Sequence, residues 1–328
     1  MTENRTRPVF TSILAERMTD FLAEKQAQGY SYHRQGLSLQ RLDRQLCALG
    51  LSDEHLPQEV VEQWTAAQPS EKPANQRHRV NVIRQFALYL RRCGIDAYVP
   101  PKAHGPVGRA GYVPYIFSHE EISHLLESVD GLQPEGHSPE RYIVMPEIFR
   151  LLYGCGLRVS EALQLRVHDV DLERGVLTIR DAKFGKDRLV PIVDSMRARL
   201  LAYSARLLVQ AEPDDYFFPA PDKTAYHRST VYGVFRNLLW SCGISHGGRG
   251  KGPRLHDIRH SFAVHCLERW YREGADLNAK LPYLSAYMGH RGPAGTERYL
   301  RLTARVFPDI VQRMEAFAGN AMPRRLEP

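Results

Sequence analysis

The chain has 328 residues, a formal net charge of +7 and a hydrophobic fraction of 43%, so it can form two domains of ordinary size with sizeable cores. The basic balance favours a polyanionic partner, most commonly nucleic acid. Its sequence contains no membrane-length apolar run, no signal peptide at its start and no CxxC pair among its five cysteines, which argues against a membrane protein, a secreted disulfide framework and a zinc ribbon and predicts a cytoplasmic location.

The first hundred residues repeat apolar side chains at helical spacing. Four such segments centre on residues 13–22, 37–49, 60–64 and 80–90. Helix-breaking prolines fall between them, at Pro57, Pro69 and Pro73. The pattern therefore predicts a small helical bundle over residues 1–98.

A Pro- and Gly-rich stretch without periodicity follows, and it predicts a linker over residues 99–112. Fully extended, a segment of this length spans roughly 45 Å. That reach exceeds the roughly 20 Å thickness of a DNA duplex, so the linker could place two domains on opposite faces of DNA.

The remaining chain predicts a second domain over residues 113–318 that combines helices with a small β-sheet. It opens with a capping box, Ser118 to Glu121, before a buried helix that ends near residue 154. The segments 175–180 and 188–192 have the composition of strands, and residues 182–187 join them as a hairpin. The expected fold class is mainly α with a small sheet. An amphipathic helix over 306–317 and a disordered tail over 319–328 complete the prediction.

Six residues between positions 158 and 299 form a set that could break a phosphodiester without a metal. Such a reaction concentrates negative charge on the phosphate, and arginine suits this task because its planar fork donates two hydrogen bonds and stays protonated. The six, in chain order, are Arg158, Lys183, His256, Arg259, His290 and Tyr299.

His256 and Arg259 are three residues apart, so on a helix they share one face. Pro253 and the glycines before it favour a helix start near His256. His260 points about 100° away from Arg259, and we interpret it as a structural or hydrogen-bonding residue. The spacing of His256 and His260 also permits a zinc site, but no third ligand stands at a familiar spacing.

The order and spacing of these motifs resemble the tyrosine recombinase (phage integrase) family. The resemblance is specific from Gly-Leu-Arg158 to Tyr299 and only architectural for the first bundle, which looks like the family's core-binding domain. It departs mildly at Met288, where the family usually has leucine.

The resemblance implies a role for each residue. The two arginines would clamp the phosphate, His256 would assist proton transfer, and His290 would hydrogen-bond a non-bridging oxygen. Tyr299 would be the nucleophile that forms a 3′-phosphotyrosine, a phenol made more reactive by the positive site. Lys183 would protonate the leaving 5′-oxygen, with Lys186 as the second candidate at the same hairpin tip.

The resemblance also implies partners. The expected substrate is double-stranded DNA with an inverted-repeat core site, bound by two subunits and joined by four in the synapse. No cofactor, metal or ATP is expected, and no membrane. The helix over 306–317 could dock on a neighbouring subunit, which we favour, or on its own domain. A non-catalytic DNA-binding regulator, a type IB topoisomerase and a zinc hydrolase are the alternatives.

Overall fold

The computed structural model describes residues 8–30, 32–102, 113–180, 187–248, 252–290, 292, 294–297 and 299–300. The described residues up to 102 belong to one compact unit, and those from 113 onward belong to a second. The predicted hairpin tip, most of the predicted linker, the predicted helix over 306–317 and the predicted tail lie outside the described residues.

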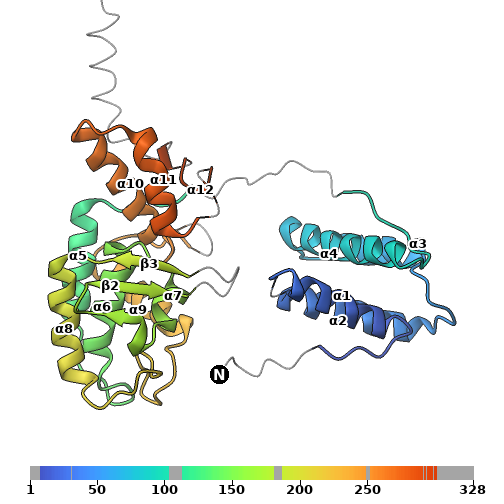
Figure 1. Cartoon of the computed structure of the whole chain (residues 1–328), viewed down its shortest axis with the longest axis horizontal. Coiled ribbons are helices and arrows are strands. Elements are labelled where there is room, and N and C mark those ends of the chain that lie inside the picture. Colours follow the sequence, from blue (N-terminus) through green and yellow to red (C-terminus); the bar gives the residue numbers. More distant parts are fainter. Residues whose placement is uncertain are drawn as a thin grey trace, which may run out of the picture. The chain divides into compact units, whose positions relative to one another are not determined.

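The N-terminal unit consists of helices, as the periodicity predicts (Figure 1). Its apolar stripes meet in one core that includes Phe21 and Phe86, whose ring centroids are 5.5 Å apart. Hydrophobic burial of these stripes gives each helix a stability that it would lack alone. The helices are α1 (Ala15–Ala27), α2 (His33–Leu49), α3 (Gln58–Thr65) and α4 (Pro73–Arg92).

The second unit is mostly helical around a small antiparallel sheet, which confirms the expected fold class. Its helices before the sheet are α5 (His119–Asp130), α6 (Arg141–Gly154), α7 (Val159–Gln164) and the 3-10 turn η1 (Val167–Asp169). Those after the sheet are α8 (Asp194–Leu207), α9 (Arg228–Ser241), α10 (Asp257–Arg272), α11 (Leu277–Met288) and the short α12 (Ala294–Glu297).

The sheet has the order β1-β2-β3 and both pairings are antiparallel. The two predicted strands are confirmed as β2 (Val176–Ile179) and β3 (Arg188–Pro191), and Ile179 pairs with Arg188 at the end of the hairpin next to the connecting segment. The sequence did not predict β1 (Val170–Asp171), because two residues are too few to show an alternation.

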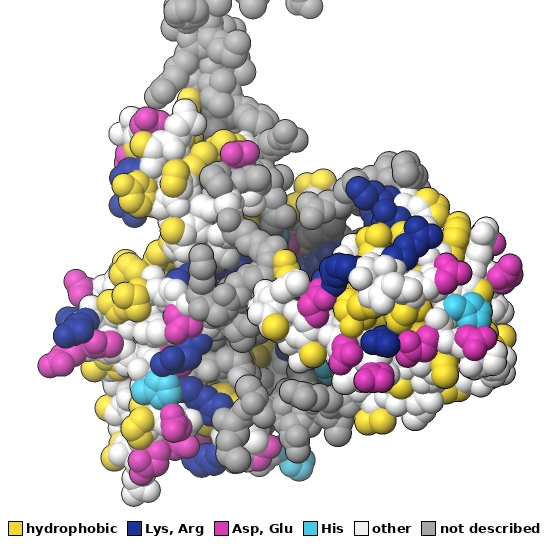
Figure 2. All heavy atoms as spheres, turned by 45° about the vertical axis from the view of Figure 1, so that its right-hand side comes forward, with side chains coloured by type: hydrophobic (Ala, Val, Ile, Leu, Met, Phe, Trp, Pro, Cys, Tyr) yellow, Lys and Arg dark blue, Asp and Glu magenta, His cyan; other side chains and the backbone are white. Residues whose placement is uncertain are grey.

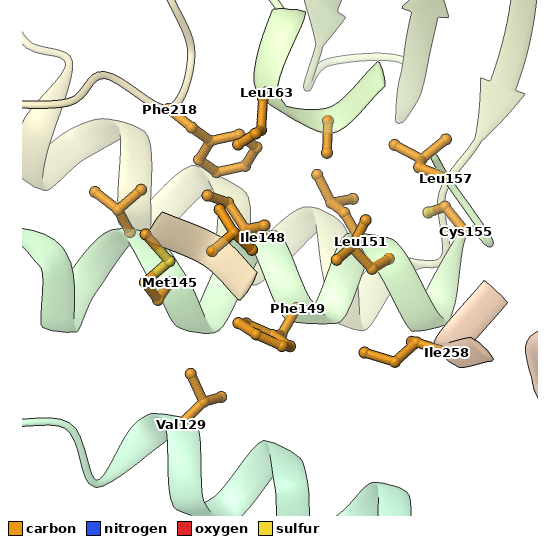
Figure 3. Packing of buried hydrophobic residues seen from close by; sticks show 14 of the residues in the cluster. Val129, Met145, Ile148, Phe149, Leu151, Cys155, Leu157, Leu163, Phe218 and Ile258 are labelled. Atoms are coloured by element: carbon orange, nitrogen blue, oxygen red, sulfur yellow. The ribbon is translucent and has the colours of Figure 1, made fainter. Parts of the chain in front are cut away.

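The core of the second unit forms around α6, the predicted buried helix. Figure 3 shows Ile148, Phe149 and Leu151 of α6 pointing into this cluster, with Ile258 of α10 beside them. The first turn of α10 is therefore anchored in the core. This matters because that same turn carries two of the six candidate residues.

Local signals at the helix ends also agree with the sequence. The Ser118 hydroxyl accepts from the Glu121 N–H at 3.0 Å, and the Glu121 carboxylate accepts from the Ser118 N–H at 2.7 Å, which confirms the capping box. Within the described residues, no helix has both the length and the apolar character that a membrane crossing requires.

Candidate active site

Arg158 stands immediately before α7 in an extended conformation, as its N-cap residue. The turn that leads to it needs a glycine, because Gly156 has a φ of +58° and a Cβ there would lie 2.4 Å from the Phe262 ring. The guanidinium of Arg158 is about one-third exposed. It donates to the backbone oxygen of Gly289 at 2.9 Å, so α7 and the end of α11 are tied together.

Arg259, in the first turn of α10, is 2% exposed. Its two terminal nitrogens donate to the backbone oxygens of Gly156 and Met288. Burial, and then the neighbouring charge of Arg158, lower the pKa of Arg259 to about 10. The guanidinium therefore keeps its charge at neutral pH, while the two backbone oxygens fix its direction.

Glu161 connects the two predicted arginines. One of its carboxylate oxygens accepts from the Arg158 side chain, and the other lies 3.8 Å from Arg259. Burial raises the pKa of Glu161, but hydrogen bonds and charge from Arg188 and Arg158 outweigh burial and hold it below its usual range. The ionised carboxylate thus compensates a cluster of like charges that would otherwise repel one another.

Arg188, the first residue of β3, is the third arginine at Glu161. It donates to both carboxylate oxygens, at 3.1 and 2.8 Å, and to the backbone oxygen of Tyr287 at 2.9 Å. Sequence reasoning missed the contributions of Glu161 and Arg188. The available signals were an acidic residue three positions after Arg158 and an arginine that opens a strand.

Tyr299 is fully buried, and its hydroxyl lies 2.9 Å from Nδ1 of His260. The interpretation of His260 as a hydrogen-bonding residue is confirmed, and the structure supplies its partner. The His260 and Tyr299 ring centroids are 5.5 Å apart, and those of His290 and Tyr299 are 6.0 Å apart. Two of the unit's histidines therefore border the candidate nucleophile.

His290 follows the left-handed Gly289, whose φ of +66° ends α11. Its backbone N–H donates to the Ser285 oxygen at 2.9 Å. Its Nδ1 lies 2.7 Å from the Thr296 hydroxyl. The imidazole is thus oriented from both sides of the turn that leads toward Tyr299.

His256 is the exposed N-cap of α10, so the predicted helix start is confirmed. Its ring centroid lies 4.7 Å from that of His260. Within the described residues, these two histidines do not belong to any group of three potential metal ligands, and His260 is engaged by Tyr299. The geometry therefore gives no support to a zinc site at this pair.

Five of the six predicted residues lie in the second unit's described part: Arg158, His256, Arg259, His290 and Tyr299. Lys183 and its alternative Lys186 lie outside the described residues. Direct contacts and shared partners connect these five side chains in two groups. The arginines meet at Glu161. His290 borders Tyr299, and His256 is connected to Tyr299 through His260.

Comparisons with known proteins agree on one family. The phage integrase family profile matches residues 116–305. An integrase/recombinase of Sinorhizobium fredii (strain NBRC 101917 / NGR234) is 32% identical over 80% of this chain and 84% of its own length. Tyrosine recombinase XerA of Thermococcus onnurineus (strain NA1) is 34% identical over 68% of this chain and 70% of its own.

Solved structures share the fold. The Tn1549 transposon integrase in complex with circular intermediate DNA has a TM-score of 0.58 and 18% identity, covering 88% of this chain and 95% of that one. The XerH recombinase bound to its palindromic difH substrate also has a TM-score of 0.58, with 20% identity, covering 79% of this chain and 70% of that one.

Proposed function

The chain belongs to the phage integrase family of tyrosine recombinases, and from this premise we propose that it cuts and rejoins DNA at specific sites through a covalent 3′-phosphotyrosine. The observation that carries the proposal is the arginine group fixed at Glu161 within the same unit as the histidine-bordered Tyr299. The resulting ester conserves the energy of the broken bond, so rejoining needs no ATP.

In this proposal Arg158 and Arg259 bind the non-bridging oxygens of the scissile phosphate. Each guanidinium is aimed by a backbone oxygen near the end of α11, Gly289 for one and Met288 for the other. Preorganised donors of this kind stabilise the charge that develops in the transition state without reorganising during the reaction. The Glu161 carboxylate keeps both in place before DNA binds.

The histidines and the lysine move and orient protons. We assign proton transfer to His256, a hydrogen bond to a non-bridging oxygen to His290, and protonation of the leaving 5′-oxygen to Lys183. His260 positions the hydroxyl of Tyr299, which it already holds at 2.9 Å. No step needs a metal ion, because the guanidinium and imidazole groups supply the positive charge.

The N-terminal unit supplies DNA contacts that hold the duplex. Arg34, Arg41 and Arg44 are exposed on neighbouring positions of one face of α2, where they can contact successive phosphates. Figure 2 shows several basic side chains gathered on one part of this unit's face. We propose residues 1–98 as the core-binding domain, 99–112 as the linker and 113–318 as the catalytic domain.

The proposed assembly follows from the symmetry of the substrate. Two subunits bind an inverted-repeat core site and four form the synapse. The predicted helix over 306–317 docks on a neighbouring subunit. DNA as the substrate also implies a cytoplasmic location.

A nicked duplex tests the reaction. The full chain is incubated, in EDTA, with a set of radiolabelled nicked duplexes covering the DNA that flanks its gene, and covalent protein–DNA adducts are separated by denaturing electrophoresis. We expect an adduct that proteinase digestion reduces to a tyrosyl peptide. Binding without an adduct on every duplex would favour the non-catalytic regulator, and supercoiled-plasmid relaxation without strand exchange would favour the topoisomerase.

The leaving-group assignment has its own test. A 5′-bridging phosphorothioate leaves without protonation, so it should restore cleavage to the Lys183→Ala variant. Rescue of Lys186→Ala instead would move the general acid three residues along the hairpin.

A further inference from the structure

A second group of chemically competent side chains lies away from the arginines. His119 is the first residue of α5, and His265 and Glu268 share one face of α10. The two imidazole centroids are 3.9 Å apart. One ligand atom from each of the three residues lies within 4.8 Å of the other two.

Glu268 is the buried carboxylate of this group, and its environment favours a bound cation. It is 1% exposed, and its Oε2 atom is buried with no hydrogen-bond partner among the residues that the structure describes. A buried carboxylate oxygen that neither water nor a donor contacts is costly unless a cation neutralises it. Nearly all buried polar atoms in native proteins have a hydrogen-bond partner or a bound ion. The Oε2 atom of Glu268 therefore points to a bound species.

His265 is oriented by a hydrogen bond that suits metal binding. Its Nδ1 lies 2.8 Å from the hydroxyl oxygen of Tyr153 on α6. When Nδ1–H donates to that oxygen, Nε2 carries the lone pair, which is how metal-binding histidines are usually fixed.

We propose that His119, His265 and Glu268 bind one divalent transition-metal ion, with Zn²⁺ as the best fit and water as the fourth ligand. Two imidazole nitrogens and a carboxylate oxygen are ligands that zinc prefers. Ligand atoms in a tetrahedral zinc site lie about 3.4 Å apart. Small rotations of the three side chains would bring their ligand atoms to this distance. His119 is exposed and provides the entry path.

The ion would have a structural role. It would join the start of α5 to the middle of α10, the helix whose first turn carries Arg259 and His260. The three ligands differ from the residues proposed for DNA chemistry, so metal binding can be tested without the proposed reaction. It differs from a zinc site at His256 and His260, since it uses the next two turns of the same helix.

Cobalt provides the test, because tetrahedral Co²⁺ absorbs visible light and competes for zinc sites. The full-length protein, without a histidine tag, is stripped with EDTA, desalted and titrated with Co²⁺ and then with Zn²⁺. We expect one equivalent of Co²⁺ to give a visible spectrum that Zn²⁺ bleaches. We also expect Zn²⁺ to raise the thermal unfolding midpoint, because it binds the native state.

Variants locate the site. His119→Ala should abolish the cobalt spectrum without harming the fold, since this side chain is exposed, whereas His124→Ala, an exposed histidine of the same helix, should keep it. Tyr153→Phe should weaken Zn²⁺ binding about 10-fold. A wild-type protein that binds no Co²⁺, or a spectrum that survives in both His119→Ala and Glu268→Gln, overturns the proposal.

Discussion

Two buried glutamates in the second unit are compensated in opposite ways. Glu161 is 9% exposed as a side chain and accepts hydrogen bonds from Arg158 and Arg188, with Arg259 close by. Glu268 is 1% exposed, and one of its carboxylate oxygens has no donor within the described part of the chain. In the first case the positive charge is part of the chain, and in the second we infer that it comes from solution.

The comparison shows two ways in which the charge of a buried carboxylate can be compensated. The arginine cluster keeps Glu161 ionised in the folded protein at neutral pH, so the carboxylate can hold the arginines in place before DNA binds. A carboxylate beside two imidazoles is tuned to an exchangeable ion instead. Variants of the two groups should therefore fail in different assays.

The largest expected effect is the loss of DNA cleavage without a loss of metal binding. Tyr299→Phe should abolish the covalent adduct completely, because the nucleophilic oxygen is gone, while DNA affinity and the cobalt spectrum stay unchanged. Adduct formation on nicked duplexes is the measurement, and Tyr283→Phe, at a residue that is 73% exposed, is the control. An adduct formed by Tyr299→Phe would show that another residue attacks.

Removing the negative charge of Glu161 should cost about 3–5 kcal/mol of unfolding free energy, because buried arginines lose their compensation. Glu161→Gln preserves the shape, so urea unfolding of this variant reports the charge. The adduct yield should fall with it. A loss below about 1 kcal/mol would mean that the arginines do not need the carboxylate.

The same variant should change the pH dependence of stability. The pKa of Glu161 is lowered in the folded state, so its contribution is fully present above the unfolded value of about 4.3 and is lost as pH falls through the lower folded value. Wild type and Glu161→Gln should therefore converge in acid. A constant difference down to pH 2 would contradict this linkage.

Gly156→Ala should cost roughly 1–3 kcal/mol, since the backbone is left-handed there and the new methyl would meet Phe262. The Gly156 oxygen accepts from Arg259, so the adduct should also form more slowly. Gly274→Ala, also at positive φ but in open space, is the matched control. The difference in stability loss between the two variants isolates the steric contribution of Phe262.

The smallest effect is expected at the second glutamate. In metal-free protein, Glu268→Gln should change stability by less than about 1 kcal/mol or raise it, because an uncompensated buried carboxylate is removed. With Zn²⁺ present, wild type should be more stable than Glu268→Gln. A large loss in the metal-free state would show that Glu268 already has a compensating partner.

The sequence predicted what depends on local order and missed what depends on distant partners. Helical spacing located α1 to α4, and Pro253 with the glycines before it predicted the start of α10. The meeting of Arg188 with Glu161 depends on how β3 packs beside α7 and α11, which no spacing encodes. His119 and His265 are separated in sequence by the whole sheet, so no local pattern predicted the contact between their rings.

The burial of Tyr299 limits when its hydroxyl can react. A phenol with no exposed surface meets neither DNA nor a nitrating reagent until the structure around it opens. Such a reagent should modify Tyr283 long before Tyr299 in the DNA-free protein. If Tyr299 is the nucleophile, as we propose, its burial would prevent cleavage during random collisions with DNA.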